Sequence, residues 1–265
     1  MEWAMPDGST FHTQEVIDDH GDFSYTSVTA IIDGKPFAGH LATPAQNLEL
    51  DDLLSALSEV SDENIYPLCP ESFRKVPDDK NQVHYLKSPS FEWIDAQPGR
   101  HFVADRFLSE ATLYELLAEQ PHPNIAIYHG CVVDEGRIKK LCLSRYERNM
   151  LEAIQERRVS DSVAERWILQ IVSAVRHLHN LGYAHNDINE MNVCVDSSGN
   201  AILIDFDSAE LLGDPVLKGQ LQEEARQLLS DERNDWVAIG ELDRKLREDY
   251  TSWRYNDNKD VEVKM

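Results

Sequence analysis

The sequence predicts an α+β protein. Short β-rich runs gather in the first half of the chain, and two of them flank Asp33-Gly34, a dipeptide typical of a two-residue hairpin turn. Amphipathic stretches dominate the second half, and the clearest lies within residues 161–181, where apolar residues recur at helical spacing. Because 42% of the 265 residues are hydrophobic, the chain can bury a substantial core and most of it should fold.

Residues 1–80 differ in composition from the rest of the chain. They hold 16 acidic and 4 basic residues, so 4 − 16 = −12 of the total charge of −23 lies in less than a third of the length. Residues 24–42 are expected to form a hairpin and residues 50–60 a short helix, followed by an irregular proline-rich linker over 66–77. We expect the acidic residues to face solvent, with a docking surface as the alternative.

From residue 81 onward, predicted strands and helices alternate. The helix over 161–181 has the strongest signal, because Ser162 and Glu165 have the spacing of a capping box in addition to the apolar periodicity. The other predicted elements are a strand over 81–88, a helix over 105–120, two strands within 125–146 around a Glu135-Gly136 turn, and a short β-pair around Ser198-Gly199.

The candidate chemical residues follow this helix. Residues 185–192 have the sequence HNDINEMN, and Asp205-Phe206-Asp207 follows the β-pair. Asp205 comes directly after an apolar run, where a carboxylate is costly unless it is paired or binds a metal. This ordered set resembles the catalytic loop, HxDxxxxN, and the metal-binding segment, DFG, of the protein-kinase-like superfamily. The spacings from Asp187 to Asn192 and to Asp205 are those of the family.

Two upstream residues extend the resemblance to roughly residues 81–246. Glu110, in FLSEATLYELL, resembles the ion-pairing glutamate of the family's small-lobe helix, and Lys87, in VHYLKS, matches the lysine that binds the nucleotide phosphates. The pattern is most similar to the divergent protein-kinase-like proteins of filamentous fungi, which also place a proline-rich segment before the lysine strand. The resemblance implies a two-lobed protein-kinase-like fold with an acidic N-terminal extension and a shortened helical C-lobe.

The resemblance also implies ATP and Mg²⁺ as cofactors and a task for each polar residue. Phosphoryl transfer depends on positioning and charge neutralisation more than on covalent help from the protein. Lys87 would contact the phosphates while Glu110 holds its ammonium group, and Asn192 and Asp205 would offer oxygen ligands to Mg²⁺. Asp187 would orient the acceptor hydroxyl and accept its proton.

Several positions depart from the protein-kinase pattern. No GxGxxG precedes Lys87, so the loop that covers the phosphates is missing or replaced, with the Asp33-Gly34 hairpin as a candidate replacement. Asn186 stands where many kinases have the arginine that binds a phosphorylated loop, and residues 208–234 contain no Thr or Tyr. Switching by phosphorylation of this segment is therefore not expected. Asp207 replaces the glycine of DFG and is a candidate metal ligand or turn cap.

Three functions are compatible with these departures. The first is ATP-dependent phosphoryl transfer to a hydroxyl of a protein or of a small molecule, since IDFD also occurs in small-molecule kinases of the aminoglycoside-phosphotransferase type. The second is a pseudokinase, in which the fold serves as a binding module. The third keeps the fold but performs other chemistry on a metabolite. We expect catalysis, because none of the five polar residues is lost.

The predicted organisation is an acidic extension over 1–80, a kinase-like N-lobe over 81–147, a C-lobe over 148–250 and a tail over 251–265, with the alternative that residues 1–80 complete the N-lobe. A helix is expected over 217–233, where the peptide-binding loop of kinases would lie. The charge of −23 repels phosphate backbones and anionic lipids, so neither nucleic acid nor membrane is an expected partner. Without a signal peptide or a long apolar run, a cytoplasmic location is expected, and the four cysteines, which form no CxxC, should be reduced.

Overall fold

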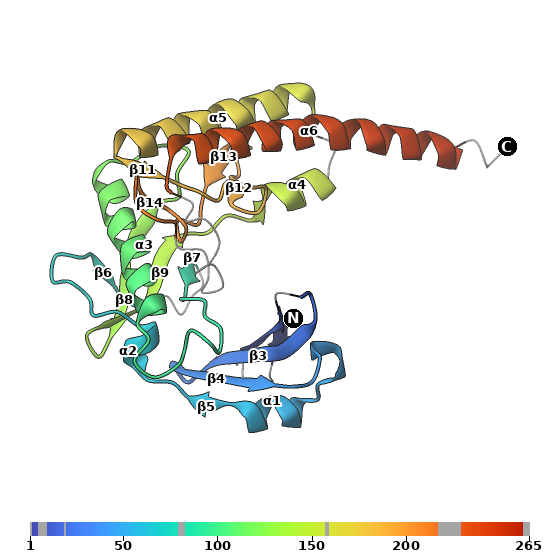
Figure 1. Ribbon diagram of the computed structural model, residues 1–265. Helices are drawn as coiled ribbons and strands as arrows, with labels where there is room; N and C mark the ends of the chain where they lie inside the picture. Colours follow the sequence, from blue (N-terminus) through green and yellow to red (C-terminus); the bar gives the residue numbers. More distant parts are fainter. Residues whose placement is uncertain are drawn as a thin grey trace. The chain divides into compact units, whose positions relative to one another are not determined.

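The computed structural model (Figure 1) describes residues 2–4, 10–18, 20–78, 83–156, 159–216 and 229–261. Both sheets and helices are present, which confirms the predicted α+β class. The chain divides into two compact units: the first holds Met1–Lys80, Leu86–Thr112 and His129–Cys142, and the second holds Asn81–Tyr85, Leu113–Tyr128 and Leu143–Met265. The four sequence ranges given above for the extension, the two lobes and the tail stay predictions.

The first unit contains a five-stranded antiparallel meander. Its strand order, β1-β2-β3-β4-β5, follows the sequence, so every strand pairs with its neighbours along the chain. The predicted hairpin is confirmed, and Asp33 and Gly34 have φ values of 51° and 79°, which a type I′ turn requires. The strands are β1 (Glu2–Ala4), β2 (Thr10–Ile17), β3 (Phe23–Ile32), β4 (Lys35–Leu41) and β5 (Ser58–Glu59).

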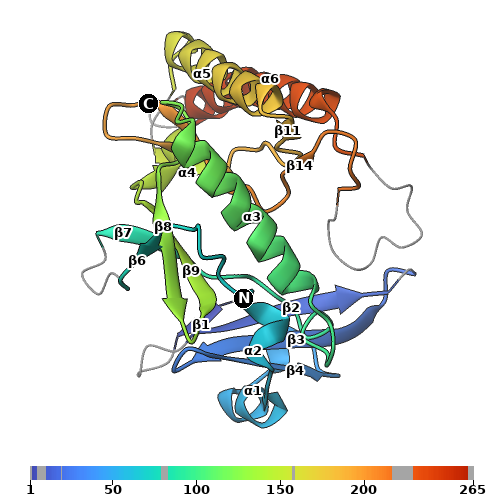
Figure 2. The same ribbon diagram turned by 90° about the vertical axis from the view of Figure 1, so that its left-hand side faces the viewer.

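One core of the first unit lies between this meander and the segment 45–56. Figure 2 shows α1 (Leu50–Ala56) against the β4 side of the sheet, after the short 3₁₀ helix η1 (Ala45–Asn47). The helix ends earlier than the predicted residue 60, because Ser58 and Glu59 pair with β4 as a strand instead. The buried residues of this core are Phe11, Val28, Ala30, Leu48 and Leu53.

A second core ties residues 1–80 to the segment 91–103. Ile65 and Tyr66, at the end of α2 (Asp62–Ile65), pack in one cluster with Phe91 and Val103. The buried Asn64 donates its side-chain amide to the carbonyl of Gln97 at 2.8 Å. The segment 66–77 is mostly irregular, as predicted, but it is more than a linker, since Tyr66 is only 2% exposed and Lys75–Val76 forms strand β6.

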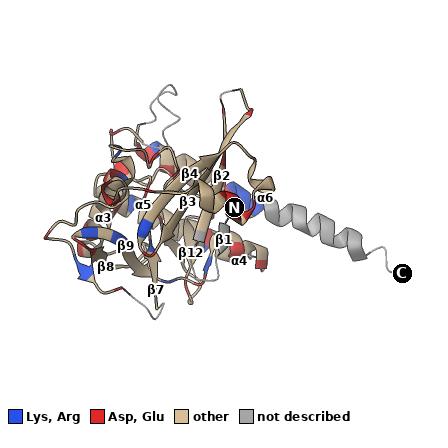
Figure 3. Cartoon of the chain, turned by 90° about the horizontal axis from the view of Figure 1, so that it is seen from below, with Lys and Arg blue, Asp and Glu red and all other residues tan. Residues whose placement is uncertain are grey.

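The acidic side chains whose burial is described, between residues 15 and 78, face solvent, as expected. All of them are exposed except Asp62, which is half-buried and forms an ion pair with Lys139. Lys139 also lies 3.9 Å above the ring of Tyr66. In Figure 3 the acidic residues are spread along the ribbon and form no single dense cluster.

A four-stranded sheet has the order β6-β8-β9-β7. Its strands are β6, β7 (His84–Lys87), β8 (Tyr128–Asp134) and β9 (Arg137–Ser144), and the helix α3 (Phe102–Glu119) precedes β8 in the sequence. Strand β6 pairs in parallel with β8, with Lys75 opposite Cys131. The predicted strand over 81–88 begins at His84 in the described residues, and residues 81 and 82 lie outside them.

The second unit is built on two long helices. Figure 1 shows α5 (Asp161–Asn180) running alongside α6 (Glu232–Val261), and their contact is the most extensive between helices of the chain. The predicted inner face of α5 is confirmed, since Trp167, Ile171 and Leu178 are buried. Its N-cap is Ser160 instead of Ser162, because the Ser160 hydroxyl accepts from Val163 N at 3.4 Å.

Short elements between these helices carry the loops of the candidate site. They are β10 (Arg148–Asn149), α4 (Met150–Glu156), β11 (Tyr183–Ala184), β12 (Val193–Val195), β13 (Ala201–Leu203) and β14 (Glu210–Leu211). The predicted β-pair around Ser198-Gly199 is the β12–β13 hairpin. The helix predicted over 217–233 falls mainly on residues outside the described ones. In its described part, Leu229 forms a β-bridge with Pro215, and helix α6 begins only at Glu232.

Candidate active site

The first unit brings Lys87 and Glu110 together. Lys87 lies at the end of β7, and its Nζ is 2.5 Å from Oε1 of Glu110 on α3. The Glu110 side chain is 2% exposed and that of Lys87 is 17% exposed. A carboxylate buried to this extent requires a cation or several hydrogen-bond donors nearby, and Lys87 supplies the cation.

The position of Glu110 on α3 explains its burial. Phe107 and Tyr114, three residues before it and four after it, lie on the same helix face and are both buried. Glu110 therefore stands within the apolar stripe of α3, where a glutamate without a partner would be strongly destabilising. This differs from the exposed position that a mid-helix glutamate usually has.

In the second unit, residues 187–192 form a compact loop closed by side-chain hydrogen bonds. The Asn192 side-chain amide donates to Oδ2 of Asp187 at 3.1 Å and to the Asp187 carbonyl at 2.9 Å. Asn189 Oδ1 accepts from the backbone N–H groups of Met191 and Asn192, at 2.9 and 3.2 Å. Asp187 and Asn192 are thus in contact, and the orientation of the Asp187 carboxylate is fixed.

The start of this loop is anchored to α6 through a buried carboxylate. Asp235, which is 0% exposed, accepts from the backbone N–H of His185 at 2.9 Å and from that of Asn186 at 2.8 Å. His179 Nε2 lies 2.8 Å from the same carboxylate. The His185 ring has a structural role, because its Nε2 lies 3.0 Å from the Ile204 carbonyl, which can only accept.

A second anchor reaches the middle of the loop. Lys245 on α6 contacts both carboxylate oxygens of Glu190, at 2.9 and 3.0 Å. Burial by itself would raise the pKa of Glu190, but a backbone hydrogen bond and Lys245 outweigh it and lower that pKa overall. The sequence provided no signal for this pair, because the two residues lie 55 positions apart.

Asp205 and Asp207 follow strand β13 and differ in environment. Asp205 is half-buried and has a φ of 63°, a left-handed conformation that aspartate tolerates better than most residues. Between them, Phe206 is buried and its ring packs edge-on against Tyr114, with ring centroids 5.2 Å apart. Asp207 is exposed, and its Oδ1 accepts a hydrogen bond from the Ser208 hydroxyl at 2.9 Å.

The donor set of Asn192 and Asp205 suits Mg²⁺. Both offer oxygen ligands, and Asn192 uses its amide nitrogen on Asp187, which leaves its amide oxygen for a cation. Within the described residues, no group of three or more His, Cys, Asp and Glu side chains is arranged to hold a metal. This agrees with the habit of Mg²⁺, which uses one or two protein oxygens and takes the rest from phosphates and water.

The Asp33-Gly34 hairpin does not extend the sheet that carries Lys87. It belongs to the five-stranded meander, whereas β7 belongs to the four-stranded sheet. Lys35, next to the turn, forms an exposed ion pair with Glu59 at 2.8 Å. The hairpin therefore lacks the sheet connection that would make it a direct substitute for a glycine-rich loop.

A buried lysine–glutamate pair, together with an HxDxxxxN loop that Asp235 anchors to α6, is typical of protein-kinase-like proteins. In agreement, residues 93–224 match the family model of the protein kinase domain. The chain is a member of the protein-kinase-like superfamily and has its two-lobed α+β fold. Lys87 lies before the matched range, so its assignment depends on the contact with Glu110.

The chain is similar to curated proteins of plants and animals that are named as kinases. The chain is 30% identical over 97 residues to mitogen-activated protein kinase kinase kinase 1 of Arabidopsis thaliana, which covers 37% of this chain and 16% of that protein. It is 34% identical over 96 residues to the human hormonally up-regulated neu tumor-associated kinase, with 35% and 13% covered. For CBL-interacting protein kinase 4 of Oryza sativa subsp. japonica, the identity is 31% over 112 residues, with 41% and 24% covered.

The chain thus spans less than a quarter of the length of these relatives. In the described part of the chain, no helix combines the length and the apolarity that crossing a bilayer requires.

Proposed function

We propose that the protein transfers the terminal phosphoryl group of ATP to a hydroxyl of a protein or small-molecule acceptor, with Mg²⁺. The observation that carries this proposal is the buried ion pair between Lys87 and Glu110, at 2.5 Å, in a chain that also has an intact HxDxxxxN loop. A binding module has no need of a buried lysine beside the nucleotide phosphates. A phosphotransferase does, because the negative charge of the phosphates must be offset.

Lys87 and Glu110 have complementary tasks in the proposed reaction. The Lys87 ammonium group has three hydrogens, and its contact with Glu110 fixes the direction of the side chain. In the proposed reaction the ammonium group donates to phosphate oxygens while Glu110 holds it in place. Glu110 acts on the reaction through Lys87 and is a positioning residue.

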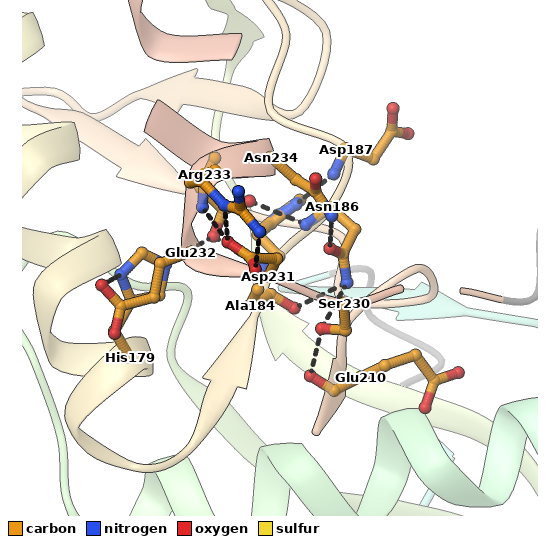
Figure 4. Close-up of polar contacts among 12 residues, drawn as sticks. His179, Ala184, Asn186, Asp187, Glu210, Ser230, Asp231, Glu232, Arg233 and Asn234 are labelled. Atoms are coloured by element: carbon orange, nitrogen blue, oxygen red, sulfur yellow. Dashed lines mark hydrogen bonds and ion pairs between the residues drawn. The ribbon is translucent and has the colours of Figure 1, made fainter. Parts of the chain in front are cut away.

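Asp187 is the proposed catalytic base. Its carboxylate would accept the proton of the acceptor hydroxyl while the hydroxyl oxygen bonds to the terminal phosphorus and the bond to the ADP oxygen breaks. The hydrogen bond from Asn192 to Oδ2 of Asp187 holds this carboxylate in a defined orientation. Figure 4 shows the Asp187 carboxylate pointing away from Asn186 and the polar groups around it.

Asn192 and Asp205 are the proposed ligands of Mg²⁺, which supplies charge neutralisation at the phosphates when it is bound. Asp207 has a weaker claim, since one of its oxygens already accepts from Ser208. We assign Asp207 to the capping of its own turn and keep it as a candidate ligand.

The competing function is a pseudokinase, and one observation favours it. No GxGxxG occurs in the 265-residue sequence, so a nucleotide would lack the usual loop of backbone N–H groups over its phosphates. This alternative predicts weak nucleotide binding that Mg²⁺ does not strengthen.

The test is a calorimetric titration of ATP with and without Mg²⁺, followed by a phosphate-transfer assay on Asp187→Asn and Asp205→Asn. Asp187→Asn should lower transfer about 10²- to 10⁴-fold and leave ATP binding largely unchanged, because the proposed role of its carboxylate is toward the acceptor hydroxyl and not toward the nucleotide. Asp205→Asn should remove the Mg²⁺ dependence of binding. Asp134→Asn, in an exposed turn, is the matched control and should resemble wild type. Unchanged transfer in Asp187→Asn would remove the general base from the proposal.

A further inference from the structure

Asn186 connects the loop at 185–192 with the segment that follows Asp207. Its side-chain amide nitrogen lies 3.1 Å from the Ser208 carbonyl, 3.1 Å from Ser230 Oγ and 3.2 Å from the Ala184 carbonyl. Two hydrogens serve these three acceptors, so one of them is shared. On the other side, Asn186 Oδ1 accepts from the Asn234 amide at 2.9 Å. This surplus of acceptors fixes the orientation of the Asn186 amide, since a flipped oxygen would face other oxygens.

Ser230, which precedes α6, connects Asn186 with the segment that contains Glu210. Its side chain is buried, the residue being 2% exposed, and its hydroxyl donates to the Glu210 carbonyl at 3.0 Å while it faces Asn186. The Ser230 N–H donates to the Asp214 carbonyl and the Ser230 carbonyl accepts from the Gly213 N–H, both at 2.8 Å. Ser230 thus joins three pieces of chain, namely the catalytic loop, residues 210–214 and the start of α6.

We call the set of Asn186, Ser230, Asn234 and the Glu210 carbonyl the amide–hydroxyl clamp, which Figure 4 shows. Every group in it is neutral. Asn186 has a φ of 61°, a conformation that asparagine adopts with less strain than most residues, so the backbone favours this residue at this position. The clamp holds the segment in place through neutral hydrogen bonds. In other switches, an arginine holds a segment by its ion pair with a phosphorylated residue.

The surroundings of Ser230 are acidic. The clamp has Glu210, Asp214, Asp231 and Asp235 on the same short segments, and Asp235 is fully buried. Arg233, three residues after Ser230, binds Asp231 through two hydrogen bonds of 2.9 and 2.7 Å. A negative charge at Ser230 would therefore meet several carboxylates and a cation that is already paired, and it would also lose the hydroxyl donor to Glu210.

We propose that the amide–hydroxyl clamp positions the segment 208–214 on the catalytic loop without phosphorylation, and that negative charge at Ser230 releases it. Because Ser230 is buried, a modifying enzyme could reach it only when the segment opens, and the added phosphate would then prevent closure. The effect is opposite in sign to that of activating phosphorylation. The consequence for catalysis rests on the proposed function, whereas the effect on the segment does not.

Hydrogen exchange of the full chain tests the clamp directly. The probes are the N–H groups of Leu212 and Gly213, which donate to the Gly182 and Ser230 carbonyls at 2.8 Å each. Ser230→Glu and Asn186→Asp, which keeps the shape but loses the donors, should each speed exchange of a peptide over 208–214 at least tenfold. Ser230→Thr, which keeps the hydroxyl, should lie closer to wild type than Ser230→Ala. Ser198→Glu, at the exposed β12–β13 turn, is the charge control and should change this peptide less than twofold.

Phosphate transfer is the second measurement on the same variants. Ser230→Glu should lower kcat more than it changes KM for ATP, and Ser230→Thr should restore transfer relative to Ser230→Ala. The clamp would be overturned if the peptide over 208–214 exchanged at the wild-type rate in both Ser230→Glu and Asn186→Asp. It would also be overturned if helix α5 exchanged as fast as this peptide in the variants, because that would mean general unfolding. If wild-type protein transfers no phosphate but the exchange results hold, the proposed function fails and the clamp stands.

Discussion

Lys87 and Glu110 illustrate how burial changes the value of an ion pair. A pair on the surface contributes little to stability, because water already stabilises both charges. Removal of one partner from a buried pair leaves a charge without compensation, which costs far more than the pair itself contributes. With Glu110 only 2% exposed, stability and proposed nucleotide binding depend on the same contact.

We predict that Lys87→Met or Glu110→Leu lowers the free energy of unfolding by about 3 kcal/mol, measured by chemical denaturation. The double variant should lose less than the sum of the two, because it removes both charges at once. Glu59→Gln breaks the exposed pair with Lys35 and should leave the unfolding midpoint unchanged. Additive losses in the double variant would show that the two buried groups do not stabilise each other.

At the scale of elements, close packing of backbone decides which residues are allowed. In β4, a Cβ atom at Gly39 would lie 2.0 Å from the Ala56 carbonyl oxygen at the end of α1. No side-chain rotation relieves a contact with backbone, so the helix can approach the strand only where glycine stands. Gly240 in α6 is the opposite case, since a Cβ there meets nothing within 4 Å.

We expect Gly39→Ala to destabilise the first unit by about 1–3 kcal/mol, as overpacked core substitutions do. Gly240→Ala is the matched control and should stabilise the protein by about 0.5–1 kcal/mol, because glycine in a helix interior costs conformational entropy. Thermal unfolding of the two variants should therefore shift in opposite directions. Equal shifts would mean that the approach of α1 to β4 is not tight in solution.

The Glu190–Lys245 pair links a loop to a helix, and its pKa fixes how it responds to pH. The pKa of Glu190 is lower in the folded state than in the unfolded chain, so the pair stabilises the protein above the unfolded value of about 4.3. This stability is lost as pH falls through the folded value. Lys245→Met should therefore cost up to about 1 kcal/mol at pH 7, a small value because both groups are partly exposed.

The measurement is the difference in unfolding free energy between wild type and Lys245→Met at pH 7 and at pH 3. The difference should shrink at the lower pH, because the unfolded chain takes up a proton at Glu190 more readily than the folded protein does. Arg247→Met, which breaks the exposed Arg247–Asp243 contact within α6, controls for the loss of a positive charge from the same helix. A difference that is independent of pH would exclude Glu190 as the partner that matters.

At the scale of the whole molecule, residues 1–80 belong to the body of the first unit. The cluster with Ile65, Tyr66, Phe91 and Val103 contains residues from both sides of the predicted boundary at 80/81. Asn64 and the Asp62–Lys139 ion pair cross the same boundary. A chain cut at this boundary would expose apolar side chains on both pieces.

We therefore expect a fragment of residues 81–265 to lose cooperative thermal unfolding or to aggregate, because Phe91 and Val103 would face water. Tyr66→Ala in the full chain removes a smaller part of the same core. It should lower the free energy of unfolding by about 3–5 kcal/mol, as the loss of other buried aromatic side chains does. Calorimetry of both proteins distinguishes the cases. A fragment that melts cooperatively at the wild-type temperature would show that residues 1–80 are an independent appendage.

How much the sequence could predict depends on the range of the interactions. The Asp33-Gly34 turn and the apolar face of α5 are local patterns and were predictable, as was the order of Lys87, Glu110 and the HxDxxxxN loop. The end of α1 and the burial of Tyr66 depend on partners elsewhere in the chain. The contact of Asn186 with Ser230 joins positions 44 apart in the sequence. The sequence alone therefore showed only that Asn186 replaces the arginine of many kinases.

The pairing of strands also fixes the sequence of events in which the first unit can form. The meander from β1 to β5 joins only segments that follow one another, so each step closes a short loop at small entropic cost. The pairing of Lys75 with Cys131 has to wait until the intervening chain exists. During synthesis the meander can therefore close before β8 leaves the ribosome, and amide protection in arrested chains of increasing length would follow that order. The five-stranded meander can then be complete before the four-stranded sheet β6-β8-β9-β7 begins to form.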